Sequence, residues 1–489
     1  MQVENSALAR AREYETKQQK LRDAAVFPIF HLRSPAGWIN DPNGFSLYEG
    51  EYHLFFQYHP YSAEWGPMHW GHAKTRDFVQ WEYLPAAMAP DQDYDCEGCF
   101  SGSAIQDGDR HILAYTSVCF EKQEDGRTKV CQTQSIAAGD GYNYSKQNGN
   151  PVIGAGQLPA GSDPENFRDP KLWKENDIYY IIAGSQDRDK TGRILKYASR
   201  DLIHWTFEGI LFRTTEKIGR MWECPDYFKL RDKQVLLISP QDMQAKGLEY
   251  HCGNGSVYFT GYEENGAFIE ESRGCMDFGT DFYAPQTLLT GDGRRIMIAW
   301  MQSWDIQNYP PEFEWSGMMT FPRELSLQGH TIRQAPAREI EQFRKNKVRY
   351  DNFCLKEKTC FADIRGRVID LTVQIKKINC SSVEIRLAKG GGHYISIEYD
   401  AAKKTIIFDR KYAQCIRDIV NERKLNLNPD RDTVTMRILM DLYSVEIFFN
   451  EGEKTLTSLF FMDLQHDDIE FIPYGGSCVL DIEKWDIKI

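Results

Sequence analysis

Three acidic residues stand in short sequences of the same kind, each followed within two positions by a proline. They are Asp41 in WINDPNG, Asp169 in RDP and Glu223 in WECP. Two carboxyl groups on opposite sides of a glycosidic bond are the equipment of glycoside hydrolysis, because one donates a proton to the leaving oxygen while the other stays ionised against the developing oxocarbenium ion. Any one of these acids alone would be an ordinary turn or edge-strand residue. The hypothesis therefore depends on whether the fold brings them together.

A repeat in the β-rich part of the sequence predicts that the three acids meet. Five apolar runs, each with a turn former seven or eight residues before its last residue, end at Gln57, Thr116, Ser185, Ser239 and Trp300. A hairpin with its turn midway places positions i and i+16 side by side. Counting back gives Asp41, Phe100, Asp169, Glu223 and Ala284, with separations of 59, 69, 54 and 61 residues. Each interval has room for four short strands, which is one blade of a β-propeller.

A second repeat supports the same unit length. The run HAKTRDFVQW at 72–81 recurs as KYASRDLIHW at 196–205, and the tryptophans that end the two runs are 124 residues apart, about two units. The predicted count is therefore five blades. In a propeller the counted positions begin the innermost strand of each blade, so the three acids should share one mouth of the central axis.

The side chains that bind a sugar are expected at the same end. Gln57 neighbours Asp41 in the hairpin, and Trp65, Phe100, Tyr283 and Trp300 belong to the same predicted region. Sugars use aromatic rings as platforms and amides as hydrogen-bond partners, although each of these rings alone would be an ordinary core residue.

The remaining sequence divides the chain into four parts. Residues 7–24 contain no Pro or Gly and predict a short helix in an N-terminal arm, 1–26. The propeller is expected over 27–330, and a charged, helical stretch marks a linker over 331–350. Alternating apolar and polar runs then predict an antiparallel β-sandwich over 351–489. The expected fold is all-β, a five-bladed β-propeller followed by a C-terminal β-sandwich.

Composition and charge exclude several other classes of function. With 71 acidic and 58 basic residues the net charge is −13, which disfavours nucleic acid and anionic membranes as partners. No run approaches the roughly 20 apolar residues of a membrane span, and the first residues form no apolar signal segment, so a cytoplasmic location is expected. The sequence has no GxSxG, GxGxxG or Walker A motif to support an elbow serine, dinucleotide binding or P-loop chemistry.

The cysteines and histidines predict no metal site. Twelve cysteines are scattered without framework spacing, which is typical of reduced thiols. Cys96 and Cys99 form a single CxxC, and His69 and His72 lie three positions apart in HWGHA. Neither pair is accompanied by the further ligands that zinc needs.

Four separated motifs together carry a family resemblance. WINDPNG at 38–44, FSGS at 100–103, RDP at 168–170 and ECP at 223–225 occur in this order, with FYA at 282–284 and FPREL at 321–325. They resemble the signature of glycoside hydrolase family 32, the β-fructofuranosidases or invertases. The resemblance covers most of residues 30–325 and implies a propeller joined to a sandwich, with retaining hydrolysis that uses no metal or cofactor.

The resemblance also implies a role for individual residues. Asp41 would be the nucleophile on the fructosyl anomeric carbon, Glu223 the general acid and then base, and Asp169 the transition-state stabiliser beside Arg168. The expected fructose pocket consists of Trp38, Asn40, Gln57, Trp65, Phe100, Ser101 and Arg168. Tyr283 and Trp300 also belong to it, although they match the pocket positions of the family less closely.

The expected activity is cleavage of the terminal β-fructoside of sucrose, sucrose 6-phosphate or short fructo-oligosaccharides. Two rival readings remain, a related furanosidase acting on arabinosides or xylosides and a noncatalytic sugar-binding propeller. The fructosyl group could also pass to a sugar instead of water. The sequence does not determine the ratio of hydrolysis to transfer, nor does it determine the oligomeric state.

Overall fold

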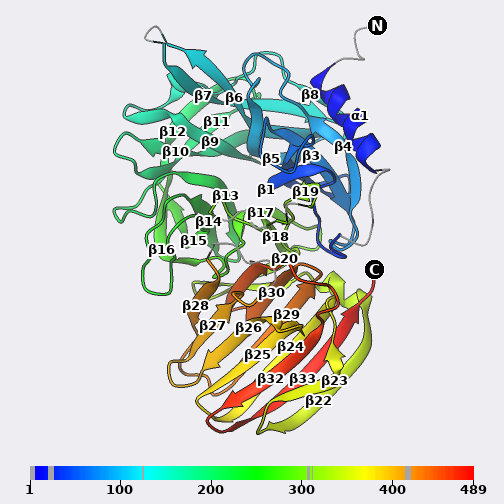
Figure 1. Ribbon diagram of the computed structural model, residues 1–489. Coiled ribbons are helices and arrows are strands. Elements are labelled where there is room, and N and C mark those ends of the chain that lie inside the picture. Colours follow the sequence, from blue (N-terminus) through cyan, green and yellow to red (C-terminus); the bar gives the residue numbers. More distant parts are fainter. Residues whose placement is uncertain (1–5, 20–26, 124–125, 306–308, 311, 414–419) are drawn as a thin grey trace.

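The computed structural model describes residues 6–19, 27–123, 126–305, 309–310, 312–413 and 420–489. Figure 1 shows two stacked bodies, one built from the blue-to-green strands and one from the yellow-to-red strands. Among the described residues, no helix is both long enough and apolar enough to cross a lipid bilayer.

The first body consists of five sheets with short connections. The first contains β1 (Gly37–Tyr48), β2 (Glu51–His59), β3 (His69–Thr75) and β4 (Glu82–Met88), with β19 (Trp315–Ser316) parallel to β1. The second contains β5 (Gly98–Asp107), β6 (Arg110–Lys122), β7 (Thr128–Gly139) and β8 (Tyr144–Lys146). After the 3-10 turn η2 (Ala155–Gln157), the third contains β9 (Ser162–Glu175), β10 (Ile178–Asp187), β11 (Gly192–Ser199) and β12 (Trp205–Phe212). The fourth contains β13 (Trp222–Leu230), β14 (Lys233–Pro240), β15 (Val257–Glu264) and β16 (Ala267–Cys275), and the fifth β17 (Tyr283–Leu289), β18 (Arg295–Trp300), β20 (Arg323–Gln328) and β21 (Thr331–Pro336).

The first strands of the five sheets close into a ring. Strand β1 contacts β5, β5 contacts β9, β9 contacts β13, β13 contacts β17, and β17 contacts β1. The hairpins turn at the predicted residues Gly50, Asp109, Asp177, Asp232 and Gly293, each between the first two strands of a blade. The body is therefore the predicted five-bladed β-propeller.

A β-bulge interrupts every innermost strand at the position where the sequence predicted chemistry. The pairing shifts between Ile39 and Pro42 in β1, and within 100–102, 168–171, 223–226 and 283–286 in the other blades. A bulge adds a residue and re-aims the neighbouring side chains. The predicted i, i+16 pairing holds for Phe100 with Thr116 and for Glu223 with Ser239. In the other three blades the bulge takes the predicted partners out of register.

The second sequence repeat is a turn after the third strand of two blades. In the first blade Thr75 Oγ1 accepts from the backbone nitrogen of Phe78 at 3.0 Å, and Asp77 Oδ1 accepts from that of Gln80 at 2.8 Å. In the third blade Ser199 and Asp201 make the same hydrogen bonds at 3.0 and 2.8 Å. The two copies of the sequence repeat therefore form the same turn, once in the first blade and once in the third.

The second body is a sandwich of two six-stranded antiparallel sheets. One sheet contains β22 (Arg344–Leu355), β33 (Ser477–Ile487), β24 (Ile369–Asn379), β29 (Val434–Asp441), β30 (Ser444–Phe449) and β31 (Lys454–Leu459). The other contains β23 (Thr359–Arg365), β32 (Asp468–Tyr474), β25 (Ser382–Gly390), β26 (His393–Asp400), β27 (Thr405–Asp409) and β28 (Glu422–Asn426). Alternate residues such as Val373, Ile385 and Ile397 are fully buried between the sheets.

A buried charged cluster joins the two bodies. The ring nitrogens of His31 lie 2.9 Å from Asp441 and 2.9 Å from Glu446, at the facing ends of β29 and β30. Arg323 of β20 also contacts Glu446, at 2.9 Å from Nε, and pairs with Asp277 at 3.0 Å. Burial lowers the pKa of His31, but hydrogen bonds to the two carboxylates overcome this effect and raise it to about 9. A protonated histidine therefore helps to hold the sandwich against the propeller.

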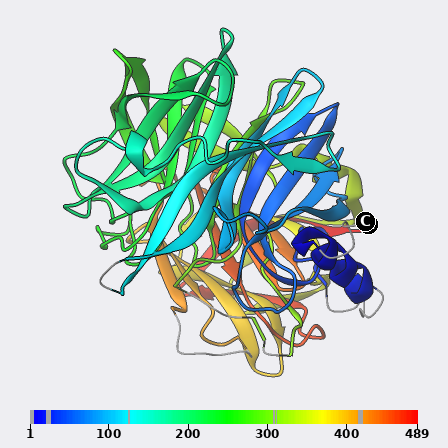
Figure 2. The same ribbon diagram turned by 90° about the horizontal axis from the view of Figure 1, so that it is seen from above.

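The connection between the two bodies differs from the predicted linker, and the N-terminal helix begins as predicted. Helix α1 (Ala7–Gln19) lies on the outside of the first blade (Figure 2), with Arg12 Nε donating to Ala86 O at 2.9 Å. The rest of the predicted helix, 20–24, lies outside the described residues. The predicted linker 331–350 is much shorter, because β21 pairs with β20 up to Pro336 and β22 begins at Arg344, which leaves only the 3-10 turn η3 (Arg338–Phe343) between them. The charged residues that suggested a helix are divided between this turn, which holds Arg338, Glu339 and Glu341, and the first positions of β22.

Candidate active site

The three predicted acids line one cavity at a mouth of the propeller axis. Its volume is about 470 Å³, and Asp41, Asp169 and Glu223 reach it from the bulges of β1, β9 and β13. All three side chains are buried, with exposed fractions of 7%, 5% and 9%. Six further predicted residues line the same cavity: Asn40, Gln57, Trp65, Phe100, Ser101 and Arg168.

Asp41 is held through one of its two carboxylate oxygens. Oδ2 accepts a hydrogen bond of 2.6 Å from Ser101 Oγ and lies 3.3 Å from Cys224 Sγ. Oδ1 is buried and has no hydrogen-bond partner among the described residues. Burial raises the pKa of Asp41, the hydrogen bond from Ser101 opposes this effect, and the charge of Glu223 adds to it.

Asp169 is held both at its backbone and at its carboxylate. Its own nitrogen donates to Thr116 Oγ1 at 2.8 Å, and its Oδ2 accepts from the nitrogen of Cys224 at 2.9 Å. Asp169 and Cys224 both have positive φ, 66° and 46°, so the two bulges face one another in uncommon conformations. Burial and the charge of Glu223 raise the pKa of Asp169 against the opposing effect of Arg168.

Glu223 accepts hydrogen bonds at both oxygens. Arg168 Nε donates to Oε1 at 2.9 Å and the hydroxyl of Tyr283 donates to Oε2 at 2.6 Å. The guanidinium of Arg168 is itself oriented by Gln132 and Asn166, whose oxygens lie 3.2 and 3.1 Å from its NH1. Glu223 is thus held in one orientation by groups from three other strands and loops.

The charges of the cavity favour a shared proton. Three buried carboxyl groups face one guanidinium, so complete ionisation would leave a net negative charge in a poorly solvated space. The raised pKa values of Asp41 and Asp169 are the consequence of this crowding, because burial and the charge of Glu223 both disfavour their ionised forms.

Both bodies of the chain match one family. Residues 31–336 match "Glycosyl hydrolases family 32 N-terminal domain" and residues 339–487 match "Glycosyl hydrolases family 32 C terminal". The chain belongs to glycoside hydrolase family 32. This result confirms the resemblance carried by the motifs.

Relatives within family 32 align along nearly the whole chain. A protein of Escherichia coli named sucrose-6-phosphate hydrolase is 34% identical over 478 residues, which are 97% of this chain and 98% of the relative. Another protein of E. coli, named raffinose invertase, is 34% identical over 494 residues, with 97% of each chain covered.

Solved structures of family 32 share the complete architecture. The β-fructofuranosidase of Bombyx mori has a TM-score of 0.86 and 32% identity, covering 99% of this chain and 98% of its own. The sucrose-6-phosphate hydrolase of Lactobacillus gasseri has a TM-score of 0.85 and 26% identity, with 99% and 98% covered. The propeller and the sandwich are therefore one conserved arrangement.

Three of the predicted site residues lie beneath the cavity instead of lining it. Trp38, Tyr283 and Trp300 have exposed fractions of 3%, 0% and 0%, and they pack with Cys224 below the acids. The prediction placed aromatic residues in the pocket by their position near the end of a strand, whereas successive side chains of a strand point to opposite faces. Trp38 Nε1 instead donates to Asn40 Oδ1 at 2.8 Å and supports a residue that does line the cavity.

Sequence reasoning missed the residues at the outer wall of the cavity, which are Val130, Gln132, Glu165, Asn166, Gln241 and Trp304. Most belong to outer strands and loops that the family 32 motifs and the i+16 count do not reach. One signal was available, the long β6–β7 hairpin, because β7 carries Val130 and Gln132 on the same face. No pattern in the sequence predicted that Trp304, four positions after Trp300, would line the cavity.

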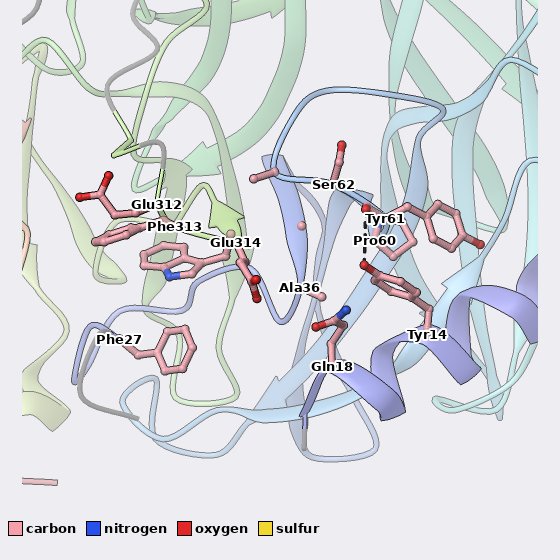
Figure 3. Close-up of a pocket in the computed structure, with 13 residues that line it drawn as sticks. Tyr14, Gln18, Phe27, Ala36, Pro60, Tyr61, Ser62, Glu312, Phe313 and Glu314 are labelled. Carbon is pink, nitrogen blue, oxygen red and sulfur yellow. Dashed lines mark hydrogen bonds between the residues drawn. The ribbon is translucent and has the colours of Figure 1, made fainter. Parts of the chain in front are cut away.

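A second cavity, of about 550 Å³, is lined by residues 60–63 (Figure 3), and the same loop between β2 and β3 carries Trp65 of the candidate active site. Tyr14 and Gln18 of α1, Tyr61 of that loop, and Glu312 and Glu314 line it. The hydroxyl of Tyr14 donates to Tyr61 O at 3.4 Å, which ties the helix to the loop. None of the three acids reaches this cavity, so it is separate from the candidate active site.

Proposed function

We propose that this chain is a retaining β-fructofuranosidase that removes the terminal β-fructosyl group from sucrose, sucrose 6-phosphate or short fructo-oligosaccharides. The observation that carries the proposal is the meeting of Asp41, Asp169 and Glu223 in one cavity of the family 32 fold. The names of the aligned relatives, sucrose-6-phosphate hydrolase and raffinose invertase, support this range of substrates.

In the first step Asp41 attacks the anomeric carbon of the fructosyl group. The bond to the glycosidic oxygen breaks, and that oxygen leaves with the proton of Glu223, so a fructosyl ester forms on Asp41. Oδ1 of Asp41 has no hydrogen bond among the described residues, whereas Oδ2 is engaged by Ser101. We therefore assign the attack to Oδ1.

In the second step the ester is hydrolysed. Glu223, now ionised, takes a proton from a water molecule whose oxygen attacks the same carbon, and the carboxylate of Asp41 leaves. Two displacements at one carbon retain its configuration. A sugar hydroxyl that replaces the water would give transfer instead of hydrolysis.

Asp169 stabilises the transition state without forming a bond to the substrate. Its Oδ2 is fixed by the nitrogen of Cys224, which leaves its carboxylate oriented in the cavity wall between the other two acids. We assign it hydrogen bonds to fructose hydroxyls that strengthen as positive charge develops on the ring. Arg168 positions Glu223 through the ion pair of 2.9 Å.

The test is steady-state kinetics on sucrose, sucrose 6-phosphate, kestose and inulin with one preparation. Fructose release from sucrose or its phosphate, lost in Asp41→Ala, is the expected result. Release of arabinose or xylose from their furanosides would favour the first rival reading, and sucrose binding without turnover the second. The cytoplasmic location expected from the sequence stays a prediction, and so do the domain boundaries other than those of the linker.

A further inference from the structure

The opposite mouth of the propeller axis holds a larger cavity that the proposed reaction does not use. This rear cavity has a volume of about 690 Å³ and is lined by residues from the later parts of all five innermost strands, with Lys171, Trp173 and Lys229 among them, and by residues of neighbouring strands that include Arg295 of β18. The candidate active site lies at the starts of the same strands. The two cavities share no lining residue.

Arg295 of β18 stands in the wall of the rear cavity without a carboxylate. Among the residues that the structure describes it forms no ion pair, and its Nε is buried without a hydrogen-bond partner. Its guanidinium lies 4.7 Å from the ring centroid of Phe228 and 3.5 Å from Thr287 Oγ1. The residue as a whole is partly exposed, so a ligand can reach its guanidinium, and its charge has no ion-pair partner among the described residues.

The neighbouring acid is already engaged. Asp226 Oδ1 pairs with Lys171 Nζ at 2.8 Å, and its Oδ2 accepts a hydrogen bond from the nitrogen of Thr287. Burial lowers the pKa of Arg295, and the charge of Asp226 opposes only part of that effect. The guanidinium of Arg295 thus keeps donors for a ligand.

The rest of the lining favours an anion attached to a small organic group. Lys196 is paired with Glu263 at 2.6 Å, whereas Lys229 and Glu175 have no ion pair within the described part of the chain. The rings of Trp173 and Tyr180 stack at 5.3 Å beside these groups. The uncommitted charges are therefore two cations and one carboxylate, next to an aromatic wall.

We propose that the rear cavity binds a phosphate group, free or carried by a sugar, with Arg295 as its principal ligand and Lys229 as a second cation. A guanidinium presents paired donors that match phosphate oxygens. The aromatic wall of Trp173 and Tyr180 would contact the sugar of a sugar phosphate. This site is independent of the proposed glycosidase reaction.

Isothermal titration calorimetry with inorganic phosphate, glucose 6-phosphate and glucose tests the proposal. We expect saturable binding of both phosphates and none of glucose. Arg295→Met should weaken phosphate binding at least tenfold. Arg213→Met, which removes an exposed arginine outside the cavity, should change it less than twofold. Tighter binding of glucose 6-phosphate than of phosphate would show that the sugar is also contacted, and equal binding would restrict recognition to the phosphate.

Two controls keep the result specific. An excess of fructose, which competes for the catalytic cavity, should not displace phosphate, and circular dichroism should show that Arg295→Met is folded. Displacement by fructose, equal binding by wild type and a folded Arg295→Met, or no binding of either phosphate to the wild type would overturn the proposal. Since the readout is binding, a failure of the glycosidase assignment would appear separately, as a lack of fructose release.

Discussion

Arg168 Nε and Glu223 Oε1 lie 2.9 Å apart in the wall of the catalytic cavity, and both side chains are nearly inaccessible to solvent. The ion pair joins the bulge of β9 to the bulge of β13. It fixes the orientation of the proposed general acid and also supplies the positive charge that faces three carboxyl groups. Changing either partner should therefore alter both the rate and its pH dependence.

Arg168→Gln should lower kcat/KM by roughly 10²-fold, because a preorganised donor is lost. Loss of the positive charge should also raise the pKa of Asp169 further, since Arg168 is the group that opposes its upward shift. The acidic limb of the pH–rate profile should then move to higher pH, because Asp169 must be ionised to stabilise the transition state. Arg193→Gln, which removes an arginine of the same blade that contacts Ser162 at 2.6 Å, is the matched control. An unchanged pH profile in Arg168→Gln would contradict the electrostatic role.

Asp41→Asn should abolish turnover and yet stabilise the fold. Because burial raises the pKa of Asp41, the ionised carboxylate disfavours the folded state at pH 7, and an amide removes that penalty. We expect the free energy of unfolding to rise by about 1 kcal/mol, measured by urea denaturation, while sucrose hydrolysis falls by roughly 10⁴-fold. A destabilised variant would show that the buried charge is compensated by groups other than those described.

Tyr283→Phe separates positioning from substrate contact. Tyr283 donates to Glu223 Oε2 at 2.6 Å but does not line the cavity. Loss of a hydrogen bond to a charged group costs about 1.5–3 kcal/mol, so kcat should fall by roughly 10- to 100-fold while KM for sucrose stays nearly constant. Steady-state kinetics would refute a positioning role if KM rose and kcat did not change.

The junction of propeller and sandwich should weaken in alkaline solution. The pKa of His31 is raised to about 9 in the folded protein, above its ordinary value of 6.5. Its contribution is therefore complete below pH 6.5 and is lost as the pH rises through 9. The unfolding free energy of wild type should exceed that of His31→Gln by on the order of 3 kcal/mol near pH 6. The difference in unfolding free energy between the two proteins should be smaller at pH 10. A gap that does not vary with pH would mean that His31 is neutral in the fold.

The propeller and the meeting of the acids could be predicted from the sequence because both depend on local patterns. Hairpin turns such as Gly50 and Asp177 recur seven or eight residues before the ends of apolar runs, and that spacing indicates which residues start each inner strand. The bulges are not visible in such a pattern. They add a residue between the acid and its expected partner, as in β9, and they decide which side chains face the cavity.

The outer wall of the site depends on side-chain contacts within β9 and between the neighbouring second and third blades, and it could not be predicted in the same way. Gln132 of β7 and Asn166 of β9 reach the cavity because both hold the guanidinium of Arg168. The i, i+16 spacing that located the acids does not locate Gln132 or Asn166. Trp300 was predicted to line the pocket, but its ring packs in the core beneath the cavity. The centroid of that ring lies 5.9 Å from the ring centroid of Trp38.

The most direct measurement follows the fate of the fructosyl group in Glu223→Ala. With an aryl β-fructofuranoside, whose leaving group needs no acid, and with added azide, the account predicts a rate that increases with azide and a product that is β-fructosyl azide. That outcome identifies Glu223 as the acid and base and shows retention through an ester on Asp41. No acceleration by azide, or an α-fructosyl azide, would contradict the account.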